Sequence, residues 1–352
     1  MTTHRIAVYP GDGIGVDVTA EAVKVLQAVA DSSDFDLALD HLPWGAQYHA
    51  EHGSVVPDDY LDTLRGYDAI LLGACGWPET LPDHVTLAPL VRIRQAFDQY
   101  ICMRPSKLYP GVTGPLRDKG PNEVDLVVLR ENSEGEYVDL GNRHHQGQPD
   151  EFALQTAVHT RRGIERILRF GFDMASKRRG RLTMVTKSNA QRYAYGLWDD
   201  IFEEIRSVFP DIQSDRQHAD AAAMNMVRCP ERFDVVVASN LFGDLLTDLA
   251  GVVGGGLGLA ASTNINPERT APSMFEPVHG SAPDIAGQGI ANPVAAVLSA
   301  AMMLDWLGEA PAAERIRRAV EQTLAAGQTT PDLGGGLTTV QMGDEVVRRL
   351  GD

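Results

Sequence analysis

Runs of apolar residues recur along the chain and predict buried strands. A strand that is apolar at every position is covered on both faces, whereas a half-exposed strand alternates with polar residues. The clearest runs are HRIAVY (4–9), DAILLGA (68–74), EVDLVVLR (123–130) and FDVVVAS (233–239), with further candidates at 35–42, 101–108 and 181–187. The pattern therefore predicts a sheet buried between two layers.

Segments with helical spacing of apolar positions separate these runs. They lie at 16–30, within 56–68, and at 87–99, 152–170, 191–208, 218–228, 239–251, 292–307, 311–326 and 340–350. Strands alternating with helices indicate an α/β fold with a mainly parallel sheet. The chain of 352 residues exceeds the size at which one core usually keeps growing, yet no linker or repeat marks a boundary. We expect two lobes that share strands.

Composition and charge narrow the classes of partner. Hydrophobic residues make up 43% and charged residues 22%, as in ordinary globular proteins. The net charge of −17 disfavours a nucleic-acid partner, although a local group of arginines can hold a small anion. Three cysteines without a CxxC pair exclude a disulfide framework. With no signal-peptide pattern and no apolar run long enough to span a bilayer, we expect a cytoplasmic protein.

Two aspartates interrupt the otherwise apolar helical segment SNLFGDLLTDLAG at 239–251. Asp244 and Asp248 are four residues apart, so they share one face of the helix. Apolar residues cover most of the remaining circumference, which predicts a largely buried helix. Because unpaired buried carboxylates are costly, we expect a cation between them, either a divalent metal ion or an Arg. Exposure of both aspartates through a gap in the packing stays open as an alternative.

Three segments rich in glycine or small residues predict turns and loops. GDGIG at 11–15 follows a predicted strand, but its glycines do not match the GxGxxG dinucleotide fingerprint, so a tight turn is favoured. GVVGGGLGLA at 251–260 is interpreted as a flexible connection between lobes. HGSAPDIAGQGIANP at 279–293 is too small and polar to build a core, and predicts a loop that wraps a ligand or an ordinary surface loop.

Five polar residues lie in or just after apolar segments and are candidates for chemistry. Planar, forked guanidinium groups suit carboxylate recognition, although pairing with structural acids remains the alternative. A Lys held away from water can act as a base, and a phenol can donate a proton, but neither is specific alone. The five residues are Arg94, Arg104, Arg130, Tyr137 and Lys187.

Six motifs together resemble the metal-dependent β-decarboxylating hydroxyacid dehydrogenases, which include the isocitrate, isopropylmalate and tartrate/D-malate enzymes. They are GDGIG (11–15), RP (104–105), RENSEGEY (130–137), TKSN (186–189), SNLFGDLLTDLAG (239–251) and EPVHGSAPDIAGQGIANP (276–293). The similarity runs in order over essentially the whole chain. It implies an isopropylmalate-dehydrogenase-like, two-lobed α/β fold with a large mixed, mainly parallel sheet that is not a standard Rossmann fold. The expected lobes are 1–102 plus 255–352, which binds the cofactor, and 103–254, which carries the dimer interface and the metal and catalytic residues.

The resemblance implies a role for each candidate. Asp244 and Asp248 correspond to metal ligands, with Asp220 supplied by the other subunit of a homodimer, and hard oxygen ligands suit Mg²⁺ or Mn²⁺. Lys187, also from the partner subunit, corresponds to the base that removes the hydroxyl proton, and Tyr137 to the acid that protonates carbon after CO₂ leaves. The three arginines named above correspond to the residues that bind the carboxylates of the substrate. A monovalent cation is a further possibility that the sequence leaves open.

The resemblance also implies a coenzyme site, and we expect it to use NAD. Members that use NADP tend to carry Lys and Tyr where this chain has Asp284 and Ile285, and an aspartate there accepts ribose hydroxyls and repels a 2′-phosphate. The expected cofactor-binding residues are Gly73, Asn189, Glu276, His279, Gly280, Ser281, Ala282, Pro283, Asp284, Ile285 and Asn292.

Residues before Arg94 bear on substrate choice within this family. Where isocitrate enzymes have Ser and Asn, this chain has Ala88 and Leu90, and the Glu of isopropylmalate enzymes is replaced by Leu87. Leu87, Leu90 and Val91 are the expected wall of the substrate pocket. The GWP…PDH pattern at 76–84, FDQY at 97–100 and LYPGV at 108–112 resemble the tartrate/D-malate subgroup. We therefore expect oxidation and β-decarboxylation of tartrate or D-malate, with 3-isopropylmalate as the alternative.

The sequence lacks the features expected of two other classes of function. A ligand-binding relative without activity is expected to lose Lys187 or Tyr137, and both are present. A phosphotransferase needs a phosphate loop with a Lys, and no GK[ST] sequence occurs. Neither class is favoured.

Overall fold

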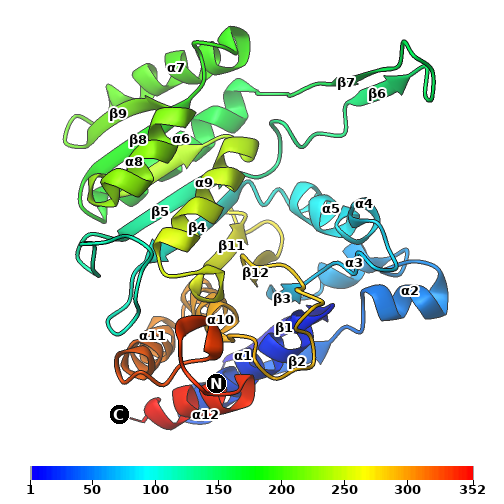
Figure 1. Cartoon of the computed structure of the whole chain (residues 1–352), viewed down its shortest axis with the longest axis vertical. Coiled ribbons are helices and arrows are strands. Elements are labelled where there is room, and N and C mark those ends of the chain that lie inside the picture. Colours follow the sequence, from blue (N-terminus) through cyan, green and yellow to red (C-terminus); the bar gives the residue numbers. More distant parts are fainter. Residues whose placement is uncertain (1, 352) are drawn as a thin grey trace.

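The computed structural model describes residues 2–351 and has an α/β fold built on one large mixed sheet (Figure 1). The strand order of this ten-stranded sheet is β2-β1-β3-β12-β11-β4-β5-β10-β8-β9, and a separate two-stranded sheet pairs β6 with β7. The strands are β1 (Thr2–Gly11), β2 (Phe35–His41), β3 (Ala69–Ala74), β4 (Ile101–Lys107), β5 (Asp125–Glu131), β6 (Gly141–His144), β7 (Phe152–Gln155), β8 (Arg181–Thr186), β9 (Gln213–His218), β10 (Val235–Ala238), β11 (Ala261–Ile265) and β12 (Ser273–Pro277).

Helices cover the large sheet and complete the apolar core. α1, α10, α11 and α12 pack together beside one half of the sheet, and α6 and α7 pack together beside the other. The helices are α1 (Ile14–Ala30), α2 (Ala46–His52), α3 (Tyr60–Leu64), α4 (Asp83–Thr86), α5 (Ala88–Ala96), α6 (Arg161–Ser176), α7 (Arg192–Arg206), α8 (Ala219–Arg228), α9 (Asn240–Val253), α10 (Val294–Leu307), α11 (Ala310–Ala325) and α12 (Thr339–Arg349). None of them, within residues 2–351, has the length and apolar character needed to cross a bilayer.

The two halves of the large sheet run in opposite directions. β1, β2, β3 and β12 are parallel to one another, as are β5, β8, β9 and β10. Between these groups, β11 is antiparallel to both β12 and β4, and β4 is antiparallel to β5. The sheet is therefore mixed but mainly parallel, as the sequence predicted.

Strands from the expected ranges group together in the sheet. β1, β2, β3, β11 and β12 come from 1–102 and 255–352, and β5, β8, β9 and β10 come from 103–254. β4 lies between the two groups of strands, so the expected boundary between the lobes falls within a strand of the shared sheet. The division into a cofactor-binding and a catalytic lobe stays a prediction, and Met1 and Asp352 lie outside the described residues.

The prediction of a helix at 152–170 is wrong for the first residues of this range. Phe152–Gln155 is β7, which pairs with β6 in an antiparallel arm that projects from the body of the molecule (Figure 1). The helix begins only after Thr160, whose side chain accepts a hydrogen bond from the Gly163 amide. A capping Thr satisfies a backbone donor that has no partner within the helix, which fixes the start of α6 at Arg161.

Three strands of the large sheet were not predicted. β9 is mostly polar and lies at the edge of the sheet, so it has no continuous apolar run. β11 and β12 are fully buried but contain polar residues such as Asn264 and Glu276, which bond to each other. Long-range pairing satisfies these polar groups, and no local pattern reveals it.

Candidate active site

β4 and β5 bring two arginines to one face of the sheet. The antiparallel register pairs Arg130 with Cys102, two residues before Arg104, so the side chains of Arg104 and Arg130 project from the same face. They are buried, with side-chain exposures of 10% and 3%. Arg130 lies near the end of β5 and Arg104 in the middle of β4, and both strands place the guanidinium in the interior.

α9 packs across this face and carries the two aspartates. Its residue Gly243 lies against Arg130, and a Cβ at this position would be only 2.7 Å from the Cβ and Cγ of Arg130. The absent side chain lets the helix approach the strand closely. One face of α9 is buried, but Leu245 is 61% and Val252 is 49% exposed. In the single chain the helix is therefore buried or partly buried at most positions, as predicted, and Leu245, Asp248 and Val252 form an exposed strip.

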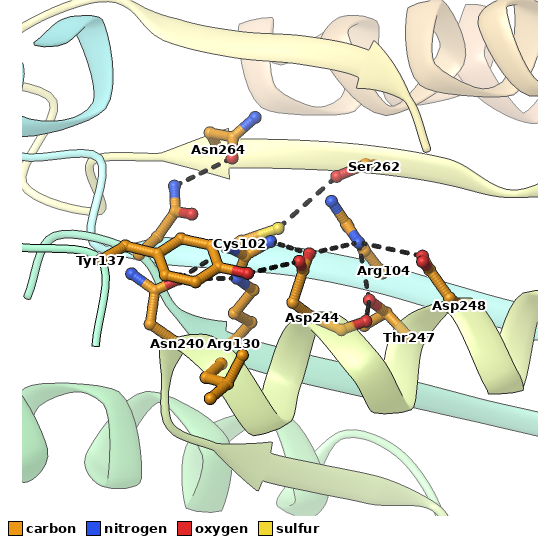
Figure 2. A network of polar contacts seen from close by, with 12 residues as sticks. Cys102, Arg104, Arg130, Tyr137, Asn240, Asp244, Thr247, Asp248, Ser262 and Asn264 are labelled. Atoms are coloured by element: carbon orange, nitrogen blue, oxygen red, sulfur yellow. Dashed lines mark hydrogen bonds and ion pairs between the residues drawn. The ribbon is translucent and has the colours of Figure 1, made fainter. Parts of the chain in front are cut away.

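Asp244 is the centre of the polar network drawn in Figure 2. Its Oδ1 accepts a hydrogen bond from Nη1 of Arg130 and lies 3.5 Å from Nη1 of Arg104. Its Oδ2 accepts a hydrogen bond of 2.8 Å from the Tyr137 hydroxyl. The same Arg104 nitrogen lies 3.8 Å from Oδ1 of Asp248. The sequence predicted a metal ion or an Arg between the two aspartates, and Arg104 lies there in the structure.

Asp248 is the more accessible of the pair. Its side chain is 62% exposed, against 32% for Asp244. Partial burial is the main cause that raises the pKa of the Asp248 carboxyl, Asp244 raises it further, and Arg104 and Arg130 act in the opposite direction. One oxygen-rich edge of this cluster therefore remains open to an incoming cation.

Tyr137 reaches the cluster from the loop after β5. Its neighbour Glu136 accepts hydrogen bonds from the Leu241 amide (3.0 Å), the Ser239 hydroxyl (3.0 Å) and the Tyr195 hydroxyl (2.6 Å), which ties the loop to the start of α9. Burial first, and then the hydrogen bond to Asp244, raise the pKa of Tyr137 to about 12. The phenol is therefore protonated and remains a proton donor at neutral pH.

A cavity of about 540 Å³ opens beside this cluster and gathers most of the predicted site residues. Its lining brings together residues assigned from the sequence to substrate, catalysis, metal and cofactor. The predicted residues among them are Gly73, Leu87, Leu90, Val91, Arg94, Arg104, Arg130, Tyr137, Asp244, Asp248, Glu276, His279 and Gly280.

Arg94 and His279 show unused bonding capacity in this cavity. Arg94 donates to Oε1 of Glu276 at 2.6 Å, while its Nε is buried without a partner. The His279 ring contacts the Gly280 carbonyl at 2.9 Å through Nδ1, and its Nε2 is likewise buried and unpaired. Burial lowers the pKa of His279, so the ring is neutral. Unpaired buried polar atoms of this kind suit a bound polar ligand.

Six of the remaining residues predicted to bind the coenzyme lie along the segment that follows the cavity wall, from Ser281 to Asn292. Ser281 is buried, Asp284 is exposed, and Ala282, Pro283 and Ile285 are intermediate. Asn292 is occupied structurally, since its amide donates to Asp332 at 3.0 Å and its carbonyl accepts the Val294 amide. The segment from 279 to 293 contains no helix or strand, in agreement with the predicted loop.

Besides the residues from Ser281 to Asn292, three further predicted residues do not line the cavity of their own chain. Lys187 and Asp220 form an ion pair of 3.1 Å with each other, and Asn189 follows Lys187 in the loop after β8. This ion pair is the main cause that lowers the pKa of Asp220. No three His, Cys, Asp or Glu side chains within residues 2–351 gather into a group that could hold a metal ion.

Asn240 and Thr247 belong to the cluster but were not singled out from the sequence. Oδ1 of Asn240 accepts from Nε and Nη2 of Arg130, and Oγ1 of Thr247 accepts from Arg104 at 2.6 Å. Positions 240, 244, 247 and 248 follow helical spacing, so this polar stripe was readable from the sequence.

Comparison with known proteins agrees with this geometry. The isocitrate/isopropylmalate dehydrogenase family matches residues 5–346. D-malate dehydrogenase [decarboxylating] from Escherichia coli (strain K12) is 48% identical over 356 residues, covering 99% of each chain. A tartrate dehydrogenase/decarboxylase from Pseudomonas putida is 45% identical, covering 97% of each chain.

The fold agrees as well. The crystal structure of isocitrate dehydrogenase from Methylococcus capsulatus superposes with a TM-score of 0.88 at 38% sequence identity, covering 99% of this chain and all of the other. The match extends over the whole large sheet and its helices, so it concerns both halves of the molecule. The chain therefore belongs to the isocitrate/isopropylmalate dehydrogenase family, as its motifs predicted, and is a dehydrogenase similar to the tartrate and D-malate enzymes.

Proposed function

We propose that this enzyme oxidises and β-decarboxylates a malate-like 2-hydroxy diacid, tartrate or D-malate, with NAD and a divalent cation. The observation that carries the proposal is the convergence of Arg94, Arg104, Arg130, Tyr137 and Asp244 on one cavity. Three guanidinium groups beside a protonated phenol suit a small dianion whose carboxylates need forked donors. The similarity to relatives that carry D-malate and tartrate in their names supports this substrate class.

Apolar residues on the cavity wall favour one second candidate. Leu87, Leu90 and Val91 line the cavity beside Arg94 and offer no polar group for a further substituent. An alkyl group on the malate skeleton would be compatible with such a wall, as in 3-isopropylmalate. We therefore keep 3-isopropylmalate as the alternative substrate.

The donor set fits Mg²⁺ or Mn²⁺, with Asp244 and Asp248 as ligands. Both are hard carboxylate donors on successive turns of α9, and Asp248 has an exposed edge. Water and substrate oxygens can complete the coordination. Following the family resemblance, we assign a third carboxylate ligand to Asp220 of a second chain. When bound, the cation would polarise the substrate's C2 oxygen and stabilise negative charge that develops there.

NAD fits the cavity wall at His279 and Gly280. Nδ1 of the neutral His279 ring donates to the Gly280 carbonyl, so the unpaired Nε2 can accept a hydrogen bond, and the space around Gly280 is open. The exposed carboxylate of Asp284 is compatible with ribose hydroxyls and unfavourable for a 2′-phosphate. When bound, the nicotinamide would accept the hydride from C2.

The protein's own residues then move two protons. Lys187 takes the proton of the 2-hydroxyl during oxidation, which leaves a 2-keto acid. Loss of the neighbouring carboxylate as CO₂ leaves an electron pair in an enolate, and Tyr137 donates its proton to C3. The hydrogen bond from Tyr137 to Asp244 holds the phenol in place while its raised pKa keeps the proton available.

We propose a homodimer whose active sites are shared between chains. Lys187 and Asp220 lie together in each chain but outside its cavity, so one complete site requires both chains. Exposed apolar side chains on α8 and α9, Met224 and Leu245 among them, suit burial in an interface next to Asp220 and Asp244. A cytoplasmic location and a monovalent-cation requirement stay predictions.

A substrate panel tests the proposed activity. NADH formation is followed with NAD, Mn²⁺ and each of D-malate, L-tartrate, meso-tartrate, 3-isopropylmalate and isocitrate, with NADP as the coenzyme control. We expect turnover with D-malate or a tartrate, and little with isocitrate or NADP. Absence of NADH with every diacid refutes the proposal, and preference for 3-isopropylmalate selects the alternative.

Mixing two inactive variants tests the shared site. Lys187→Met and Tyr137→Phe are unfolded and refolded together so that chains exchange. If Lys187 and Tyr137 act across the interface, a mixed dimer contains one intact site and regains activity. Activity no higher than the average of the separate variants contradicts the shared site.

A further inference from the structure

We propose that Asp12, in the GDGIG turn, is a positioning residue that fixes the loops on the coenzyme side of the active site. Asp12 is 6% exposed. Its Oδ1 accepts the Ala46 amide at 2.7 Å, and its Oδ2 accepts the Gly76 amide at 2.9 Å. One carboxylate thus joins three segments that are far apart in sequence. The positional role rests on the proposed use of NAD.

The backbone of the same turn holds the segment that carries His279 and Gly280. The Ile14 amide donates to the Ser281 carbonyl at 2.8 Å, just past Gly280. One turn into α1, the Asp17 carboxylate accepts the Gly287 amide at 3.1 Å. The loop is therefore attached at two points to the residues around GDGIG.

Glycines permit this contact because the turn meets its neighbours backbone to backbone. Gly11 and Gly13 have φ of 71° and 57°, in the region that favours glycine. A Cβ on Gly11 would overlap the carbonyl oxygen of Ala74, and one on Gly13 would overlap that of Ser281. Side chains at these positions would push both cavity-lining segments away from the turn.

The hydrogen bonds argue against a phosphate-binding role for this turn. The Asp12 amide already donates to Ala74 at 2.6 Å, and the Ile14 amide donates to Ser281. The Gly15 amide donates to the Asp12 carbonyl at 3.0 Å. An anion cradle needs free amides, and the Asp12 carboxylate would repel a phosphate. The turn therefore binds protein loops in place of a ligand.

The segments that Asp12 and its turn hold are two walls of the active-site cavity. Gly73 to Cys75 precede Gly76 on one wall, and Glu276 to Gly280 precede Ser281 on the other. Loss of the carboxylate leaves the buried Gly76 amide without its acceptor, so the distance between the two walls is no longer fixed. We expect this to raise the KM for NAD about tenfold, the equivalent of one lost hydrogen bond to a charged group. Because Asp12 contacts no reacting atom, kcat should change much less.

Asp12→Asn and Asp12→Ala test the role, with Asp234→Asn as the matched control. Asp234 is also a buried carboxylate that accepts backbone amides, from Arg179 at 2.9 Å and Arg181 at 3.3 Å, but it lies outside the active-site cavity. We expect both Asp12 variants to raise the KM for NAD, Asn less than Ala because it keeps one acceptor. Asp234→Asn should lower the melting temperature with an unchanged KM.

Two kinetic results overturn the inference: an unchanged KM for NAD in both Asp12 variants, or an equal rise in Asp234→Asn. If Asp12→Ala does not fold, Asp12→Asn carries the test. Amide hydrogen exchange of peptides covering Gly76 and Ala46 gives a readout independent of turnover. Faster exchange there in Asp12→Asn supports the positioning role, and unchanged exchange refutes it. An inactive wild-type enzyme refutes the proposed function and leaves the exchange result to decide the role of Asp12.

Discussion

Gly243→Ala is the substitution that most directly tests how α9 positions the aspartates. The added Cβ would lie 2.7 Å from Cβ and Cγ and 3.1 Å from Cα of Arg130. Carbon atoms in contact settle at about 3.5–4.0 Å, so helix and strand must separate by roughly 1 Å or Arg130 must leave its place. Either movement separates Asp244 from the Arg130 and Tyr137 groups that it now contacts.

Stability and activity should respond differently to this change. Alanine favours a helix over glycine by about 1 kcal/mol, while overpacking costs about 1–3 kcal/mol, so the net destabilisation should be no more than about 2 kcal/mol. A displacement of roughly 1 Å within an active site can cost about 100-fold in rate. We therefore expect kcat/KM to fall about 100-fold while the protein remains folded.

Steady-state kinetics and thermal melting check this expectation. Gly196→Ala is the matched control, because Gly196 lies within α7 and a Cβ there meets nothing within 4 Å. The control should gain stability and keep its activity. If Gly243→Ala has the kcat/KM of the wild type, close approach of α9 to Arg130 does not position the cluster, and the reasoning is wrong.

Three further predictions concern the metal site, the phenol and the interface. Asp248→Asn should weaken Mn²⁺ binding at least about tenfold, measured by calorimetry, and unchanged affinity removes Asp248 from the ligand set. Tyr137, with its pKa raised to about 12, should stay neutral past its ordinary pKa of about 10, so its stabilising effect is present below pH 10 and lost as the pH rises toward 12. An ultraviolet titration that loses a step below pH 10 in Tyr137→Phe contradicts this. Leu245→Lys, at a 61% exposed position of α9, should yield inactive monomers by light scattering, whereas Val16→Lys, 50% exposed on α1, should not.

The sequence predicted the fold where apolar patterns are continuous and local. The buried strands β3 and β5 were predicted because each contains an uninterrupted run of buried apolar side chains. The antiparallel arm of β6 and β7 was not predicted. Phe152 and Leu154 of β7 are exposed, so the spacing of these apolar residues does not indicate a side that packs on the core. Thr160 was a usable helix-start signal, since capping is encoded within a few residues.

The motifs predicted many of the residues that line the cavity, but they did not predict the hydrogen bonds and ion pairs between them. The four-residue helical spacing predicted that Asp244 and Asp248 lie together, and the cost of burying unpaired carboxylates predicted a cation beside them. That Arg104 is this neighbour depends on a contact between residues 140 or more positions apart. The same holds for Asp12, whose acceptor role appears only when Ala46 and Gly76 are brought to it by the fold.

Arg104 also bears on how the enzyme would behave without the metal ion proposed above. Because its guanidinium lies within 3.8 Å of both aspartates, each carboxylate keeps an internal counter-ion after chelation. The apoenzyme should therefore tolerate chelators without unfolding. Since this side chain fills the strand side of the cluster, the proposed ion would enter from the exposed side of Asp248.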